Sequence, residues 1–203
     1  MRFNVKNVPA AVLLGICLAG TSVGAAVVNF DDLTPGFIPS SYDGFNWGPD
    51  WAVEDNADYN AGYGNSVTFP SAPNAAYNGY GDVTVSLSSG SAFDFNGADF
   101  TEWAYDNADW SEGATSITVD GYNGATLVGS ATEALSPSGF TYLNANLDDV
   151  TSLVFNNGGT SGQWWLMDNF TYNSAPDGGS TISFLGMGLA GLVALRRKLM
   201  PKA

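Results

Sequence analysis

The sequence has no histidine, a single cysteine (Cys17), and no lysine or arginine between residues 26 and 175. All six basic residues lie near the ends of the chain, at Arg2, Lys6, Arg196, Arg197, Lys198 and Lys202. All but one of the 20 acidic residues, Asp177 being the exception, lie in the stretch without basic residues, and the net charge is −14. This stretch therefore cannot form a salt bridge between its own side chains.

These absences exclude several classes of function. Nucleic acids and anionic lipid head groups are held by Lys and Arg, and an acidic surface without them repels both, so no nucleic-acid partner is expected. Without histidine, and with one cysteine only, the chain lacks the usual nucleophile and base pairs of hydrolases. Any catalysis would depend on carboxylates alone, and we expect a protein that is not an enzyme.

Residues 1–25 have the features of a secretory signal peptide. Arg2 and Lys6 supply the positive start, residues 8–19 the apolar segment, and residues 21–25 a run of small residues suited to cleavage. Cys17 lies inside the apolar segment and would be removed with it. The exported protein would then have no cysteine and no disulfide.

The other end carries a second apolar segment. Residues 178–195 contain no charge and are followed at once by Arg196, Arg197 and Lys198. Eighteen residues are at the lower limit for crossing a bilayer, and the basic cluster would keep the C-terminal side in the cytoplasm. We expect a single transmembrane helix here, with a buried core helix as the alternative.

The residues that precede this segment are Pro176, Asp177, Gly178, Gly179 and Ser180. Together with the apolar run and the basic end, they resemble the PEP-CTERM class of sorting signals, in its VPDGG or VPDSG-like variant. The resemblance implies recognition and cleavage by a membrane protease of the exosortase type. It also implies a destination at the cell surface or in the extracellular polysaccharide matrix of a Gram-negative bacterium.

The region between the two ends, residues 26–175, shows the two-residue alternation and the turn residues of an all-β domain. Residues 116–122 and 126–131 form a predicted hairpin around Gly124. The expected strands cover residues 27–32, 45–47, 66–69, 83–87, 92–95, 116–122, 126–131, 140–145, 151–155 and 163–172. Many short strands at this spacing favour a β-sandwich, most plausibly a jelly roll. Residues 35–65 are expected to form a long loop layer.

The opening strand at Phe30, Asp31 and Asp32 and the closing strand at residues 166–172 are similar to those of galactose-binding-like and carbohydrate-binding-module jelly rolls. Domains of that kind often hold a structural calcium ion where the first and last strands meet. The resemblance therefore implies a calcium site at this junction.

The residues themselves lead to the same place. In the last strand Trp164, Leu166, Asp168, Phe170 and Tyr172 would share one face, and in the first strand Val28, Phe30 and Asp32 would do so. An ionised carboxylate among apolar side chains needs a counter-charge or several hydrogen-bond donors. Because the domain has no cationic side chain, we expect calcium at Asp32 and Asp168, with Asp31 and Asn169 as further ligands. The alternatives are that each carboxylate accepts backbone N–H bonds, or that the strand ends before the Asp and leaves it in water.

Tryptophan is the second candidate feature. Trp47, Trp51, Trp103 and Trp110 lie in polar surroundings rich in Gly, Asp and Asn, and an exposed cluster among them would offer a stacking surface for sugar rings. Core packing is the alternative for each of them. Trp164 and Trp165 are adjacent in one strand, so one of the two must face inward.

The sequence thus predicts an exported, non-catalytic cell-surface or matrix protein associated with extracellular polysaccharide. Two other readings remain open. One is a polysaccharide-degrading enzyme that uses paired carboxylates, such as Asp55 with Asp58 or Asp99 with Glu102. The other is a structural coat protein without a ligand.

Overall fold

The computed structural model describes residues 24–63, 66–79, 82–104, 113–157, 163–174 and 191. Within these residues the chain forms thirteen strands and one helix. In chain order they are β1 (Ala26–Val28), β2 (Gly36–Phe37), β3 (Ser41–Tyr42), β4 (Phe45–Trp47), β5 (Trp51–Asp55), α1 (Asn56–Tyr63), β6 (Asn74–Asn78), β7 (Val83–Leu87), β8 (Phe93–Glu102), β9 (Ser116–Asn123), β10 (Thr126–Ala134), β11 (Thr141–Val150), β12 (Ser152–Asn156) and β13 (Trp165–Ser174).

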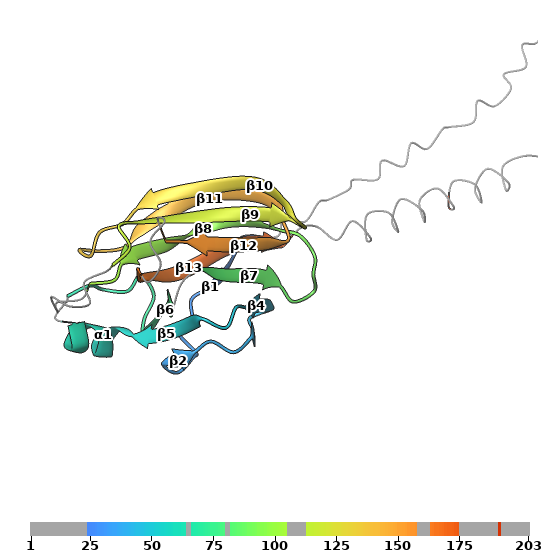
Figure 1. Ribbon diagram of the computed structural model, residues 1–203. Helices are drawn as coiled ribbons and strands as arrows, with labels where there is room; N and C mark the ends of the chain where they lie inside the picture. Colours follow the sequence, from blue (N-terminus) through green and yellow to red (C-terminus); the bar gives the residue numbers. More distant parts are fainter. Residues whose placement is uncertain are drawn as a thin grey trace, which may run out of the picture.

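The strands form two sheets that face each other (Figure 1). The first, called sheet A, has the order β11-β8-β13-β6-β5-β2, with β1 paired to β13. The second, sheet B, has the order β10-β9-β12-β7-β4-β3. The predicted all-β, two-sheet sandwich is confirmed, and so is the predicted hairpin, in which Asn123 of β9 pairs with Thr126 of β10.

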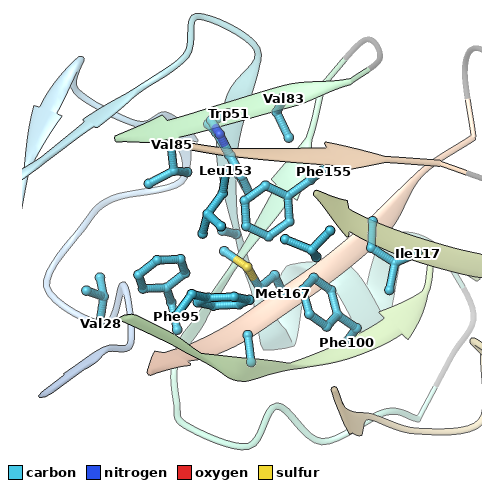
Figure 2. Packing of buried hydrophobic residues seen from close by; sticks show 14 of the residues in the cluster. Val28, Trp51, Val83, Val85, Phe95, Phe100, Ile117, Leu153, Phe155 and Met167 are labelled. Carbon is cyan, nitrogen blue, oxygen red and sulfur yellow. The ribbon is translucent and has the colours of Figure 1, made fainter. Parts of the chain in front are cut away.

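The core lies between the sheets and is rich in aromatic rings. Phe95, Phe100 and Met167 of sheet A face Leu153 and Phe155 of sheet B, and all five side chains are fully buried (Figure 2). Alternate residues of β7, β9 and β12 supply this core, as expected for strands with one face buried.

A smaller apolar cluster covers part of the outer face of sheet A. We call it the outer cluster, and its buried members are Tyr59, Val67, Phe69, Ala75, Trp103 and Leu166. Helix α1 provides Tyr59, and the segment before β6 provides Val67 and Phe69. This second layer covers only part of the outer face, and Tyr142 on the edge strand β11 is exposed.

Several predicted elements differ from the observed ones. Residues 66–69 form no strand, although Val67 and Phe69 are buried. The expected loop layer at residues 35–65 holds four strands, β2 to β5, and helix α1. Strand β6, with the sequence Asn-Ala-Ala-Tyr-Asn, was not predicted.

The two predicted targeting segments fall largely outside the described residues, since only residues 24 and 25 of the signal peptide and Gly191 of the apolar tail are described. No helix among the described residues has the length and apolar character needed to cross a membrane.

Candidate functional site

Asp168 lies on the outer face of sheet A and is fully buried. On β13, Trp165 and Met167 point into the core between the sheets, whereas Leu166 belongs to the outer cluster. Asp168 follows Leu166 by two residues and lies on the same face. The prediction that Asp168 shares a face with Phe170 is wrong, because the register shifts between Asp168 and Thr171 and Asn169 has a φ of 50°. This bulge turns Phe170 into the core.

Three hydrogen-bond donors surround the Asp168 carboxylate. Ser71 donates its backbone N–H to Oδ2 and its hydroxyl to Oδ1, both at 2.7 Å, and the N–H of Asn169 donates to Oδ1 at 2.7 Å. These bonds lower the pKa of Asp168, but burial raises it more and Asp31 adds a repulsive charge, so that the pKa rises to about 6. At neutral pH the ionised carboxylate is therefore only partly compensated.

Asp31 lies in a turn that is docked onto the start of β6 by Asn74. The N–H of Asn74 donates to Asp31 Oδ1 at 3.1 Å, and its Nδ2 donates to the carbonyl oxygens of Phe30 (3.1 Å) and Leu33 (2.7 Å). The Ser71 hydroxyl also reaches the Asn29 carbonyl oxygen, at 3.4 Å. The turn and the segment around Ser71 thus meet at Asp168.

One acceptor in this region is left over. Asn74 is buried, and its Oδ1 has no hydrogen-bond partner among the described residues. A buried amide oxygen that accepts no hydrogen bond lowers the stability of the folded protein, so its presence needs an explanation. Asp31 and, through the Ser71 hydroxyl, the Asn29 carbonyl oxygen therefore lie close to Asp168, and the unpaired amide oxygen belongs to the residue that holds the turn.

The structure corrects two of the predicted calcium ligands. Asp32 is exposed and accepts a hydrogen bond from the Tyr42 hydroxyl at 2.6 Å. The side chain of Asn169 donates instead to Asp99 Oδ2 at 3.0 Å. The cause at Asp32 is that β1 ends at Val28 and Phe30 has a φ of 62°, which breaks the two-residue alternation and brings Asp31 to the junction in place of Asp32.

The predicted tryptophan surface is also corrected. Trp47 (3% exposed), Trp51 (0%) and Trp103 (3%) are buried, so they cannot offer a stacking face to a sugar. Trp47 and Trp51 fill the core from β4 and β5, and Trp103 packs edge-on against Trp164 in the outer cluster. Trp110 lies outside the described residues. Trp165 faces inward, in agreement with the expectation for the Trp164 and Trp165 pair.

Two of the four carboxylates considered as catalytic pairs, Asp55 and Asp99, accept structural hydrogen bonds. Asp55 caps helix α1, since its Oδ1 accepts the N–H groups of Ala57 (2.8 Å) and Asp58 (3.2 Å). Asp99 accepts the Asn169 amide described above. Burial raises the pKa of Glu102, but no acidic partner contributes to that shift.

Sequence reasoning missed Ser71 and Asn74. Both lie in or beside a short segment of small residues whose pattern gives no sign of a buried polar contact. The signal that could have found them is the isolated Asn74 at the head of an Ala-Ala pair, a polar residue directly before two small apolar ones.

Three solved structures are similar to this chain along most of its length. A DUF4465 family protein from Bacteroides caccae matches with a TM-score of 0.52 and 12% identity, over 74% of this chain and 99% of that one. The K2 cleaved adhesin domain of Lys-gingipain has a TM-score of 0.44 and 11% identity, over 73% and 99%. TmCBM61, solved with β-1,4-galactotriose, has a TM-score of 0.38 and 13% identity, over 73% and 99%. Only the first of these likenesses is close enough to speak for a shared fold.

No curated protein matches this sequence. The C-terminal end, in contrast, matches a family model: residues 176–199 match the VPDSG-CTERM motif. This match covers the predicted sorting residues Pro176, Asp177, Gly178, Gly179 and Ser180. The chain therefore carries a VPDSG-CTERM sorting motif at its C-terminus, which implies processing by an exosortase-type system and export to the cell surface.

Proposed function

We propose that this chain is a non-catalytic surface or extracellular-matrix protein that binds polysaccharide. The observation that carries the proposal is the VPDSG-CTERM motif at residues 176–199. In this proposal residues 1–25 are the signal peptide, residues 26–175 the exported domain, and residues 176–203 the sorting signal with its transmembrane helix and basic tail. The final location is the cell surface or matrix of a Gram-negative bacterium.

We further infer that the sandwich is a jelly roll. Eight of its strands pair in nested order along the chain: β6 with β13, β7 with β12, β8 with β11 and β9 with β10. Rolling a folded ribbon of four antiparallel pairs produces this arrangement. Jelly rolls include lectin domains, which supports a binding role by analogy of fold alone.

Two features support the absence of catalysis. The exported domain has no histidine, cysteine or basic side chain, so carboxylates would have to act as both acid and base. The carboxylate with the most strongly raised pKa is Asp168, the kind of group that could serve as a catalytic acid, but it is 0% exposed and out of reach of a polysaccharide. Among the described residues, the carboxylate with the largest shift is therefore not accessible to a substrate, which counts against the rival reading of a carboxylate-dependent hydrolase.

Calcium binding at the junction of Asp31 and Asp168 is part of the proposal. No group of three or more His, Cys, Asp or Glu side chains suited to a metal occurs in the described part of the chain. However, Ca²⁺ also accepts amide and carbonyl oxygens, and the unpaired Oδ1 of Asn74 fits that preference. Asp31, Asp168 and Asn74 would hold the ion, with the Asn29 carbonyl oxygen beside them. The ion would supply the positive charge that no side chain here provides.

The calcium proposal is tested by melting the purified protein with calcium and with a chelator. Calcium that binds the folded state raises the melting temperature by mass action. We expect the calcium-dependent increase to disappear in Asp168→Asn, which keeps the shape of the side chain, and to persist in Asp32→Asn, which removes an exposed carboxylate outside the junction. An increase of equal size in all three proteins would place the ion elsewhere.

Export and binding are tested separately. Mass spectrometry of extracellular protein should find no peptide beyond about Gly179, and a Pro176→Ala variant should retain its tail; recovery of Lys202 in released wild-type protein would count against processing. Retention on a polysaccharide panel without release of reducing ends supports binding. Release of reducing ends that one Asp or Glu substitution abolishes would establish the enzyme reading instead.

A further inference from the structure

One row of three residues on adjacent strands runs along the outer face of sheet A, from the buried Asp168 to the exposed Tyr142. Asp168 of β13 pairs in register with Asp99 of β8, and Asp99 pairs with Tyr142 of β11. Residues that are directly opposite in an antiparallel pair share a face, so Tyr142 lies on the outer surface beside Asp99. Tyr142 is 43% exposed, whereas Asp168 at the other end of the row is buried.

The ring of Tyr142 is held close to the sheet because Gly97 lies diagonally across from it. A Cβ atom at Gly97 would come within 2.9 Å of both Cζ and Oη of Tyr142, and it would also overlap the carbonyl oxygen of Leu143. The tip of the tyrosine therefore lies over bare backbone, where any other residue would push it away. An aromatic ring that lies along a sheet offers its other face to the solvent.

Polar groups border this ring. Asp99 accepts a hydrogen bond from Asn169 Nδ2 at 3.0 Å, and a carboxylate has about four acceptor positions, so it retains capacity for further donors. In the neighbouring part of the face, Asn173 donates to Asn96 Oδ1 at 3.1 Å. These side chains are held in place by their mutual hydrogen bonds before any ligand arrives.

We propose that Tyr142, Asp99 and Asn169 form a binding site for one sugar ring of a neutral polysaccharide. The apolar C–H face of the sugar packs on the tyrosine ring, and its hydroxyl groups donate to Asp99 and accept from Asn169. A neutral glycan is favoured over a uronic-acid or sulfated one, because the exported domain has no Lys, Arg or His with which to meet an anion. This inference rests on the proposed binding function and assigns it to one site.

The site is tested by affinity electrophoresis of the purified protein in gels containing β-1,4-galactan, hydroxyethyl cellulose, mannan or dextran, with alginate as the anionic comparison. We expect retardation by at least one neutral polymer and none by alginate. Tyr142→Ala should weaken binding by about tenfold or more, and Tyr142→Phe, which keeps the ring, should retain it. Phe37→Ala is the matched control, since Phe37 is an aromatic residue 68% exposed at the opposite edge of the same sheet.

The outcomes separate the site from the function. Equal retardation of the wild type and Tyr142→Ala would overturn the site and leave polysaccharide binding standing. Absence of retardation of the wild type by every polymer would overturn both, and retardation by alginate alone would overturn the neutral-glycan assignment. Loss in Tyr142→Phe as well as in Tyr142→Ala would reject ring stacking as the basis of binding. The melting temperatures of the Tyr142 variants should equal that of the wild type, because the side chain is exposed.

Discussion

At the scale of single residues, Glu54 shows what it means for a carboxylate to lie in a domain without cations. Its side chain on β5 is half-buried. Burial raises the pKa of Glu54 most, and the neighbouring charges of Asp58 and Asp55 raise it further, against one backbone hydrogen bond that lowers it. Water hydrates the ionised Glu54 freely in the unfolded chain but only partly in the folded protein. Ionisation of Glu54 therefore lowers the free energy of unfolding.

This cost makes Glu54→Gln a stabilising substitution at neutral pH. Because the pKa is raised on folding, the folded protein binds more protons than the unfolded one as the pH passes through the interval above the ordinary value of 4.5. The contribution of Glu54 to stability accordingly falls as the pH rises through this interval. The difference in melting temperature between Glu54→Gln and the wild type should be largest at about pH 7 and vanish below about pH 4. Asp148→Asn, at an exposed position, is the control and should give a smaller difference than Glu54→Gln at about pH 7.

Single residues also mark the limit of sequence reasoning. The burial of Asp168 could be predicted from its place in an alternating strand. The position of Asp31, instead of Asp32, near Asp168 could not be predicted. It depends on a positive φ at the buried Phe30, a conformation that a bulky residue rarely adopts. Tyr142 could not be predicted as a binding residue either, because its position depends on Gly97 of the neighbouring strand.

At the scale of elements, the turn after β1 is held by one side chain. Asn74 Nδ2 bonds the carbonyl oxygens of Phe30 and Leu33, and strand β1 itself contributes only three residue pairs with β13. Removing this amide in Asn74→Ala takes one donor from each carbonyl oxygen, although that of Phe30 keeps the N–H of Leu33. The substitution should lower the free energy of unfolding by about 1–3 kcal/mol. Chemical denaturation measures the loss. Asn60→Ala, which removes an amide that donates to the Val67 carbonyl oxygen away from this turn, is the comparison and should leave the calcium-dependent increase in melting temperature unchanged.

Elements with a strong two-residue pattern were predicted well, and those with small or polar residues were not. The β9–β10 hairpin follows from its alternation and from Gly124, which has a φ of 60°. The sequence does not predict strand β6, because Ala and Asn are poor strand formers. Its pairing with β5 and β13 makes it a strand. Trp47 and Trp51 were misplaced for a related reason, since Gly, Pro and Asp around them indicate loops while their strands lie over the core.

At the scale of the whole molecule, the charge of the exported domain has one sign only. Monovalent salt screens repulsion between its carboxylates, and there are no ion pairs between side chains of residues 26–175 for salt to weaken. The melting temperature should therefore rise between about 0.01 M and about 0.5 M KCl in the presence of a chelator. A fall over this range would mean that attractive charge interactions dominate after all. Calcium at millimolar concentration should raise the melting temperature by more than this screening does. Magnesium at the same concentration serves as the comparison.

The pairing of the chain's first and last strands bears on how the domain withstands force. Ala26 of β1 lies opposite Tyr172 of β13, so the chain enters and leaves the sandwich at the same place. Strand β13 runs through the interior of sheet A and pairs with β8 along eight residue pairs. A tether at the C-terminal end would pull β13 lengthwise, so its ladder hydrogen bonds would share the load in shear instead of opening one by one. A domain suspended in this way is well placed to resist drag from a polymer gel.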